Sequence, residues 1–200
     1  MTTKCMSLLL SMIATEPPPQ PELLPEAPAD WRFERIDFPL SFAPEITLTG
    51  FEELRFAPGM FKPESDTYFT YVFAMKITDD VTLDTMGLHS LLETYFRGLC
   101  RTVAAEKKFD IDTSKIRAHI RADQPVAPKV RNFSGSVASF DPFVTGKPLT
   151  LNFEMIVIDM SRKDHRIFAA LSPKPADSPN WKTLRTLKDQ FVERWAQSPK

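Results

Sequence analysis

Apolar and polar residues alternate with a period of two in several stretches of the chain, which is the pattern of a half-buried strand. Residues 149–155 alternate in this way, and Ile156, Val157 and Ile158 are then apolar on both faces. We therefore expect the far half of this strand to be covered on both sides. The strongest example is Tyr68 to Thr78, where one face carries Phe69, Tyr71, Phe73, Met75 and Ile77. Further strands are predicted for Trp31–Phe38, Phe51–Phe56, Lys115–Ala122, Phe133–Phe140, where Gly135 indicates a bulge, and Arg166–Leu171.

Two stretches change to the three-to-four-residue spacing of an amphipathic helix. The first is Leu83 to Ala105, and the acceptors that precede it are predicted to cap its start: Asp79, Asp80 and Thr82. The second starts at Ser178 and Pro179, a capping residue followed by a proline at the first helical position. Its apolar stripe is Trp181, Leu184, Leu187, Phe191 and Trp195. We expect this stripe to cover the sheet, with Trp195 buried and Lys188 facing solvent.

The order of these elements is strands, a long helix, strands and a terminal helix. Strands broken by single helices predict an α+β fold, with a mostly antiparallel sheet of about six or seven strands and a long middle helix and a C-terminal helix packed on it. Of the 200 residues 42% are hydrophobic and 16 are Phe, which is enough for one substantial core. The sequence thus predicts a single α+β domain over residues 31–200.

The N-terminal thirty residues have a different composition from the rest. Residues 1–15 contain one lysine and a short apolar run, too short to span a membrane, and this pattern predicts a signal peptide. Residues 16–30 are rich in proline and predict a disordered tether. We expect a periplasmic or secreted protein whose mature chain starts near Thr15 or Glu16, and a cytoplasmic location is the alternative.

Chemical motifs fail when their residues are checked one by one. Gly146-Lys147 lacks the earlier glycine and the following hydroxyl of a phosphate-binding loop. The run Asp110–Ser114 resembles a calcium loop, but Lys115 stands where the glycine is needed. Neither the three His residues nor Cys100, which continues an apolar helical face, has the partners that a metal site or a nucleophile needs. Glu52 and Glu53 are adjacent in a strand, so their side chains point to opposite faces. We predict no catalytic residue, cofactor site or metal site.

One strand has a basic face that could bind a ligand. Arg117, His119 and Arg121 alternate with Ile116, Ala118 and Ile120, and side chains two apart stand about 7 Å from each other along a strand. These three residues are the candidate anion-binding surface. The alternative is a charged edge that prevents aggregation or is neutralised by acidic neighbours. A formal net charge of −1 supplies no field for nucleic acid, so we expect no nucleic-acid partner. The partner is expected to be another protein or an anionic ligand. The apolar run near the N-terminus is too short to span a membrane, so we expect no transmembrane segment.

Several blocks of the sequence resemble known proteins. FPLSFAPEI, TGFEELRFAPGMF, YFTYVFAM, VTGKPLTLNFE and DHRIFAALSPKPADSPNW are similar to blocks of uncharacterised exported proteins of Gram-negative bacteria that have no assigned activity, over Trp31 to Trp195. The last hairpin followed by a Trp-led helix is similar in layout to PsbP-like domains. That resemblance implies an antiparallel sheet with helices on its faces and a role in binding or assembly, and it assigns no functional residue.

These observations favour a non-enzymatic exported binding or assembly module. Strong core patterning coexists with a tether and with no reactive constellation. The alternative is a small enzyme of the hydrolase type whose site residues converge only in the fold, around His119, Asp164 or His165. A deep pocket with a His, a carboxylate and perturbed pKa values would favour the enzyme.

Overall fold

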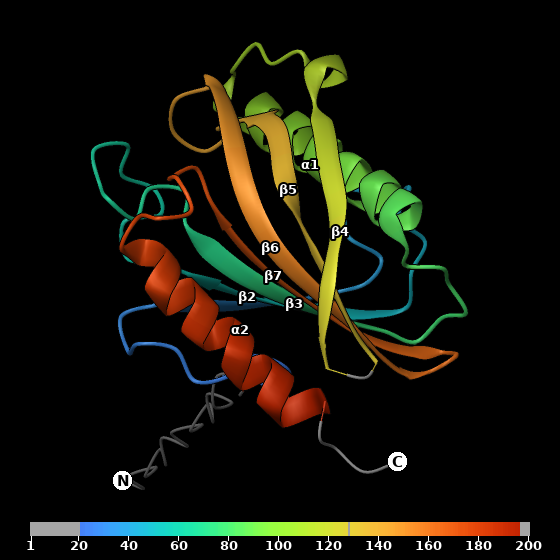
Figure 1. Ribbon diagram of the computed structural model, residues 1–200. Helices are drawn as coiled ribbons and strands as arrows, with labels where there is room; N and C mark the ends of the chain where they lie inside the picture. The colour runs from blue at the N-terminus through green and yellow to red at the C-terminus, as the bar shows by residue number, and fades with distance from the viewer. Residues whose placement is uncertain (1–20, 128, 197–200) are drawn as a thin grey trace, which may run out of the picture.

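Seven strands form one antiparallel sheet in the part of the chain that this computed structural model describes, residues 21–127 and 129–196 (Figure 1). The strand order is β1-β2-β3-β7-β6-β5-β4, so the hairpin that comes last in sequence lies in the middle of the sheet. The elements are β1 (Arg32–Asp37), β2 (Gly50–Phe56), β3 (Tyr71–Ile77), α1 (Thr85–Lys107), a short 3-10 turn (Thr113–Lys115), β4 (Arg117–Ala127), β5 (Val130–Phe140), β6 (Pro148–Ser161), β7 (Asp164–Ser172) and α2 (Asn180–Ala196). The predicted α+β class, with a long middle helix and a C-terminal helix packed on the sheet, is confirmed.

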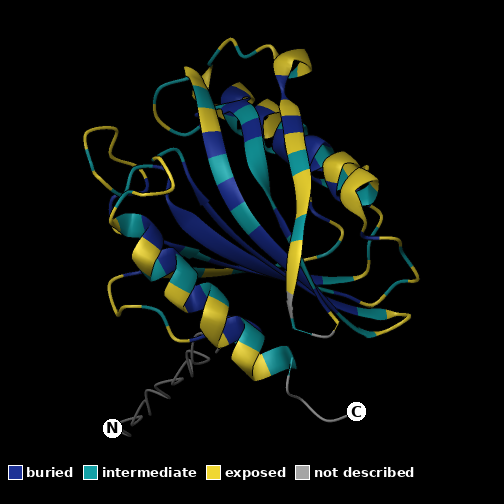
Figure 2. Cartoon of the chain, in the orientation of Figure 1, coloured by how far each residue is buried: buried dark blue, intermediate teal, exposed yellow. Residues whose placement is uncertain are grey.

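The two helices pack on opposite faces of the sheet, which we call the α1 face and the α2 face (Figure 1). Strand β6 shows the consequence. Val157 belongs to the core on the α1 face, and Ile156 and Ile158 belong to the core on the α2 face. Three consecutive apolar residues are therefore buried, as the sequence predicts, because both faces are covered at this point. Figure 2 shows the central strands buried along most of their length, whereas the edge strand β4 alternates with exposed positions.

Helix α1 buries the apolar face that its spacing predicts, including Leu88, Leu92 and Phe96. Its cap differs from the prediction. Asp84 is the N-cap, and its Oδ1 accepts a hydrogen bond of 2.8 Å from the Gly87 backbone N–H. Asp79 instead accepts a hydrogen bond from the Thr49 backbone N–H, which joins the end of β3 to the segment before β2.

Helix α2 covers the opposite face through Trp181, Leu184, Leu187 and Phe191, all buried. The Phe191 ring lies 5.2 Å from the ring of Phe168 in the central strand β7. The predicted docking is thus present, but two details differ. Trp195 is only half-buried near the end of the helix, and Lys188 forms an ion pair with Glu154 of β6 instead of facing solvent freely.

The segment before β1 is packed against the domain, in contrast to the tether predicted over residues 16–30. Leu23 and Leu24 are buried on the α2 face, and the carboxylate of Glu53 accepts the backbone N–H groups of Glu22, Leu23 and Leu24 at 2.7, 2.9 and 3.0 Å. The indole N–H of Trp195 donates to the Leu23 carbonyl. The prediction is wrong for residues 21–30, and the packed domain extends N-terminal to residue 31. The predicted signal peptide and residues 16–20 lie outside the described residues.

Strand β5 is longer than predicted and is regular at Gly135, where we predict a bulge. Gly135 pairs with Ile120 on one side and Phe153 on the other. The glycine is needed for close approach, because a Cβ atom there would lie 1.8 Å from the His119 carbonyl oxygen. The irregular pairing occurs instead in β4, between Asp123 and Ala127.

Candidate functional site

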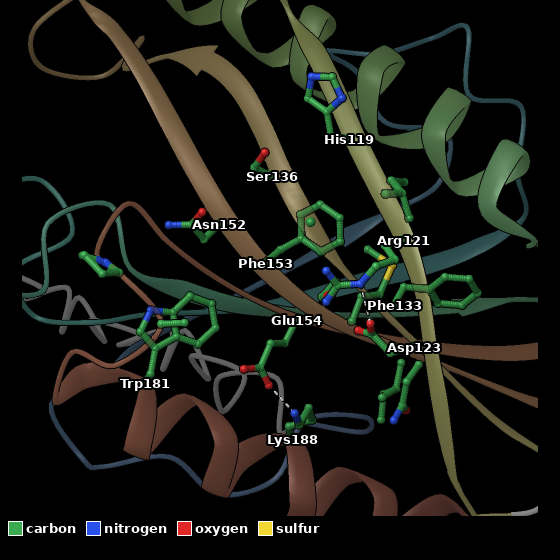
Figure 3. Close-up of a pocket in the computed structure, with 18 residues that line it drawn as sticks. His119, Arg121, Asp123, Phe133, Ser136, Asn152, Phe153, Glu154, Trp181 and Lys188 are labelled. Atoms are coloured by element: carbon green, nitrogen blue, oxygen red, sulfur yellow. Dashed lines mark hydrogen bonds and ion pairs between the residues drawn. The ribbon is translucent and has the colours of Figure 1, made fainter.

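A groove of about 700 Å³ lies on the α2 face, over β4, β5 and β6. Helix α2 crosses the face over the central strands and leaves most of β4 and β5 and the first half of β6 uncovered (Figure 1). The groove therefore has the sheet as its floor and the start of α2 as one wall, with Trp181 and Lys188 on that wall and β4 on the far side (Figure 3).

The floor of the groove is built from polar side chains in two cross-strand rows. In the first row, His119 of β4 pairs with Ser136 of β5, which pairs with Asn152 of β6. In the second row, two residues along, the paired residues are Arg121, Ser134 and Glu154. Alternate residues of a strand share a face, so all six side chains belong to the α2 face.

Ion pairs hold the second row in place at both ends. The Nε of Arg121 donates to Asp123 Oδ1 at 2.8 Å, and its Nη2 donates to the Ser134 hydroxyl at 2.8 Å. At the other end, Glu154 accepts from Arg185 at 2.7 Å and from Lys188, both of α2. Burial alone would raise the pKa of Glu154, but these two cations outweigh it and lower that pKa. Glu154 is therefore a carboxylate at neutral pH, and its charge is balanced.

The candidate anion-binding surface is split by the structure. His119 and Arg121 line the groove, whereas Arg117 is not among the lining residues. The Arg117 guanidinium turns back along the chain and donates to the carbonyls of Ser114 and Ile116 at 2.6 and 2.7 Å. The His119 ring is exposed, and it forms no hydrogen bond or ion pair with any residue that the structure describes. Asp123, two residues further along the same strand, neutralises Arg121.

Sequence reasoning missed the residues that β5, β6 and α2 add to the groove. A signal for them exists in the sequence, because Asn132, Ser134 and Ser136 form a polar face with a period of two, and Asn152 and Glu154 continue it on the next strand. Their meeting with His119 depends on the pairing register. Trp181 and Lys188 of α2 carry no such signal, because the helical spacing assigns the first to the core and the second to solvent, and neither assignment indicates a groove.

The His and Asp residues suggested for an enzyme do not form a free acid-base pair. His165 Nδ1 lies 2.7 Å from Asp159 Oδ1, and its Nε2 lies 3.2 Å from the Arg162 carbonyl oxygen. Both ring nitrogens are therefore engaged, and a general base needs one that is free. Asp159 also accepts from Arg131, and Asp164 is paired with Arg166. This cluster fastens the β6–β7 hairpin.

Two adjacent carboxyl groups are fully buried in β2, on opposite faces as predicted. Glu53 holds the N-terminal segment on the α2 face. On the α1 face, Glu52 accepts a 3.2 Å hydrogen bond from the Tyr95 hydroxyl through Oε2, and its Oε1 has no partner among the described residues. Burial raises the pKa of Glu52 to about 8, against a smaller lowering by the Tyr95 bond. Glu52 is thus protonated at neutral pH. Cys100 is also buried on the α1 face, and burial raises the pKa of its thiol, which disfavours a reactive thiolate.

The run Asp110–Ser114, which resembles a calcium loop only in part, forms local structure instead. Asp112 accepts from the backbone N–H and the hydroxyl of Ser114 and so caps the 3-10 turn. Within residues 21–127 and 129–196, no group of three or more His, Cys, Asp or Glu side chains is arranged to hold a metal ion. Neither α1 nor α2, the helices of the described chain, is long and apolar enough to cross a membrane. In comparisons with known proteins, no protein family, no curated protein and no solved structure matches the chain.

Proposed function

We propose that the protein is a non-enzymatic binding module that holds the anionic group of a polar ligand in the groove of the α2 face. The observation that supports this most directly is the set of donors at the β4 end of the groove. His119, Arg121, Ser134 and Ser136 come from two paired strands and converge on one uncovered corner.

These donors suit a carboxylate or a related oxyanion. Arg121 uses Nε and Nη2 for Asp123 and Ser134, which fixes the plane of the guanidinium, and none of the bonds described for the groove involves its Nη1. A guanidinium fixed in one plane recognises an oxyanion with good geometry. The His119 ring and the Ser136 hydroxyl stand in the adjacent row, so they would bind further oxygens of the same ligand.

The charge balance predicts weak, salt-sensitive binding. Among the charged residues that line the groove, Arg121 and Lys188 are offset by Asp123 and Glu154. The ligand must therefore compete with Asp123 for Arg121, and exposed pairs of this kind are screened by salt. We expect the ligand to be held by several hydrogen bonds together and not by a strong positive field.

Titration of the full chain with citrate, followed by 1H–15N NMR, tests this function. Citrate should shift amide signals of β4 and β5 around His119 and Ser134 saturably, and added NaCl should weaken the effect. Arg121→Gln should abolish the shifts. Arg117→Gln is the matched control, because it lies on the same strand outside the groove and should leave them unchanged. Equal shifts in both variants, or none in the unmodified protein, would remove the groove from consideration.

One observation favours the alternative of a small hydrolase. Ser136 and His119 are opposite each other in the register of β4 and β5, the distance at which a nucleophile and a base could meet. The hydroxyl and the ring form no hydrogen bond, and no described carboxylate orients the ring. Hydrolysis of p-nitrophenyl acetate by the unmodified protein but not by Ser136→Ala would establish the enzyme, and equal background rates would support the binding module.

We also propose that the module works outside the cytoplasm. The support comes from the short apolar run and proline-rich stretch at the N-terminus and from the resemblance to exported proteins and PsbP-like domains. Mass spectrometry of the protein recovered from its native cell should find a new N-terminus near residue 15 or 16. An intact Met1 or Thr2 terminus in the cytoplasmic fraction would contradict export.

A further inference from the structure

A second cavity lies on the other side of the sheet, under the α1 face at the β1 edge. It has a volume of about 210 Å³ and is enclosed by α1, strands β1 to β3 and the loops around residues 42, 61 and 143. Half of the residues that line it are aromatic, and they come from segments far apart in the sequence: Phe42, Phe56, Phe61, Tyr71, Tyr95 and Phe143 are among them. The sheet separates it from the polar groove, so the two sites are independent.

The aromatic walls form a preformed cage. The ring of Phe61 lies 5.4 Å from that of Phe143 in an edge-to-face arrangement and 6.1 Å from that of Phe56, and Phe56 in turn lies 5.9 Å from Tyr71. Phe61 is 38% exposed, which makes it one of the few large apolar side chains that reach the surface in the described chain. Protein interiors are normally filled to the density of organic crystals, so an aromatic void that reaches the surface indicates a binding site.

No charge inside the cavity is available for a charged ligand. Arg32 and Glu34 line the rim from β1 and are paired with each other at 3.5 Å. The Arg32 guanidinium also lies 5.1 Å from the centre of the Phe56 ring and 5.4 Å from that of Phe61. Deeper in the wall, the Tyr95 hydroxyl is committed to Glu52, whose carboxyl group is protonated. A charged group placed deep in this cavity, beyond the rim, would lose its hydration without gaining a partner.

From the size, the aromatic walls and the balanced rim, we infer that this cavity is a second binding site, for an uncharged aromatic compound with a single ring. An apolar cavity of roughly 150 Å³ can bind benzene in another protein, so 210 Å³ accommodates a ring with one or two small substituents. Edge-to-face contacts with the wall rings would favour an aromatic over a saturated ring.

Titration of the full chain with p-cresol, followed by NMR, tests the site. The amides around Leu99 and Phe61 should shift saturably. 4-Methylcyclohexanol, which carries the same substituents on a saturated ring, should bind several-fold more weakly, and p-toluate should bind at least about tenfold more weakly because its carboxylate must be desolvated. Equal affinity for p-toluate and p-cresol, or no saturable p-cresol binding, would overturn the inference.

A variant that fills the cavity separates it from other apolar sites. Val103 of α1 lines the cavity and is half-buried, so Val103→Phe should occupy it and lower p-cresol affinity at least about tenfold. Leu99→Phe, one turn earlier, is a second filling variant in case the first does not fold. Val192→Phe makes the same change at a half-buried position of α2, on the other face, and should keep the affinity. Unchanged p-cresol affinity in a folded filling variant would refute the site.

Discussion

Replacing Glu52 with Gln should make the protein more stable, and the gain should grow with pH. The carboxyl group is fully buried in the core under α1, and burial raises its pKa from 4.5 to about 8. Between these two values the folded protein keeps the proton while the unfolded chain has lost it. The unfolded state then binds fewer protons, so stability falls as pH rises.

The size of this effect follows from the same two values. Each pH unit between 4.5 and 8 lowers the free energy of unfolding by about 1.4 kcal/mol, which gives roughly 3 kcal/mol at pH 7 and about 5 kcal/mol above pH 8. The contribution is complete below pH 4.5 and is lost once pH 8 is passed. Gln keeps an oxygen that can accept a hydrogen bond from Tyr95, and it does not titrate. The free energy of unfolding of the variant therefore does not fall with pH at this position.

Urea unfolding of both proteins at pH 5, 6, 7, 8 and 9 and constant ionic strength measures the difference. We expect a small difference at pH 5, a steady rise, and a plateau above pH 8. Glu53→Gln is the matched control, because Glu53 is equally buried but accepts three backbone N–H groups. The side-chain NH2 group of the new Gln would point at a backbone N–H group, so two hydrogen-bond donors would meet with no acceptor between them. This variant should therefore be destabilised by about 1–3 kcal/mol at pH 7. A Glu52→Gln difference that is constant from pH 5 to 9 would refute the reasoning.

Two further predictions concern packing. Trp181→Ala should lower the free energy of unfolding by about 3–5 kcal/mol because the side chain is 1% exposed. Trp195→Ala should lower it by less because Trp195 is half-buried, and equal denaturant midpoints for the two variants would mean that α2 is docked differently. Gly135→Ala should lower the free energy of unfolding by about 1–3 kcal/mol or more, because its Cβ would push away the β4 backbone at His119. The same variant should weaken the NMR shifts that citrate causes. Ser136→Ala, at the next residue, should keep a stability near that of the unmodified protein.

Local periodicity determined most of the elements. The five alternating apolar residues of β3 and the apolar face of α1 each belong to one continuous segment, so burial on one side leaves a pattern that can be read without knowing the neighbour. The change in pattern at Ile156 to Ile158 even indicated two covered faces. The direction of Glu52 and Glu53 followed from the strand alone, although the depth of their burial did not.

Only the tertiary structure decided how these elements combine. Leu23 and Leu24 lie in a proline-rich stretch with no period, and their backbone is held against the domain by a carboxylate about thirty residues away and by the end of α2. The groove likewise depends on a register that places His119 opposite Ser136, and the aromatic cavity depends on loops and strands meeting at the β1 edge. The physical reason is that a period reports whether a side chain is buried, whereas the partner that buries it comes from another part of the chain and leaves no mark on the local sequence.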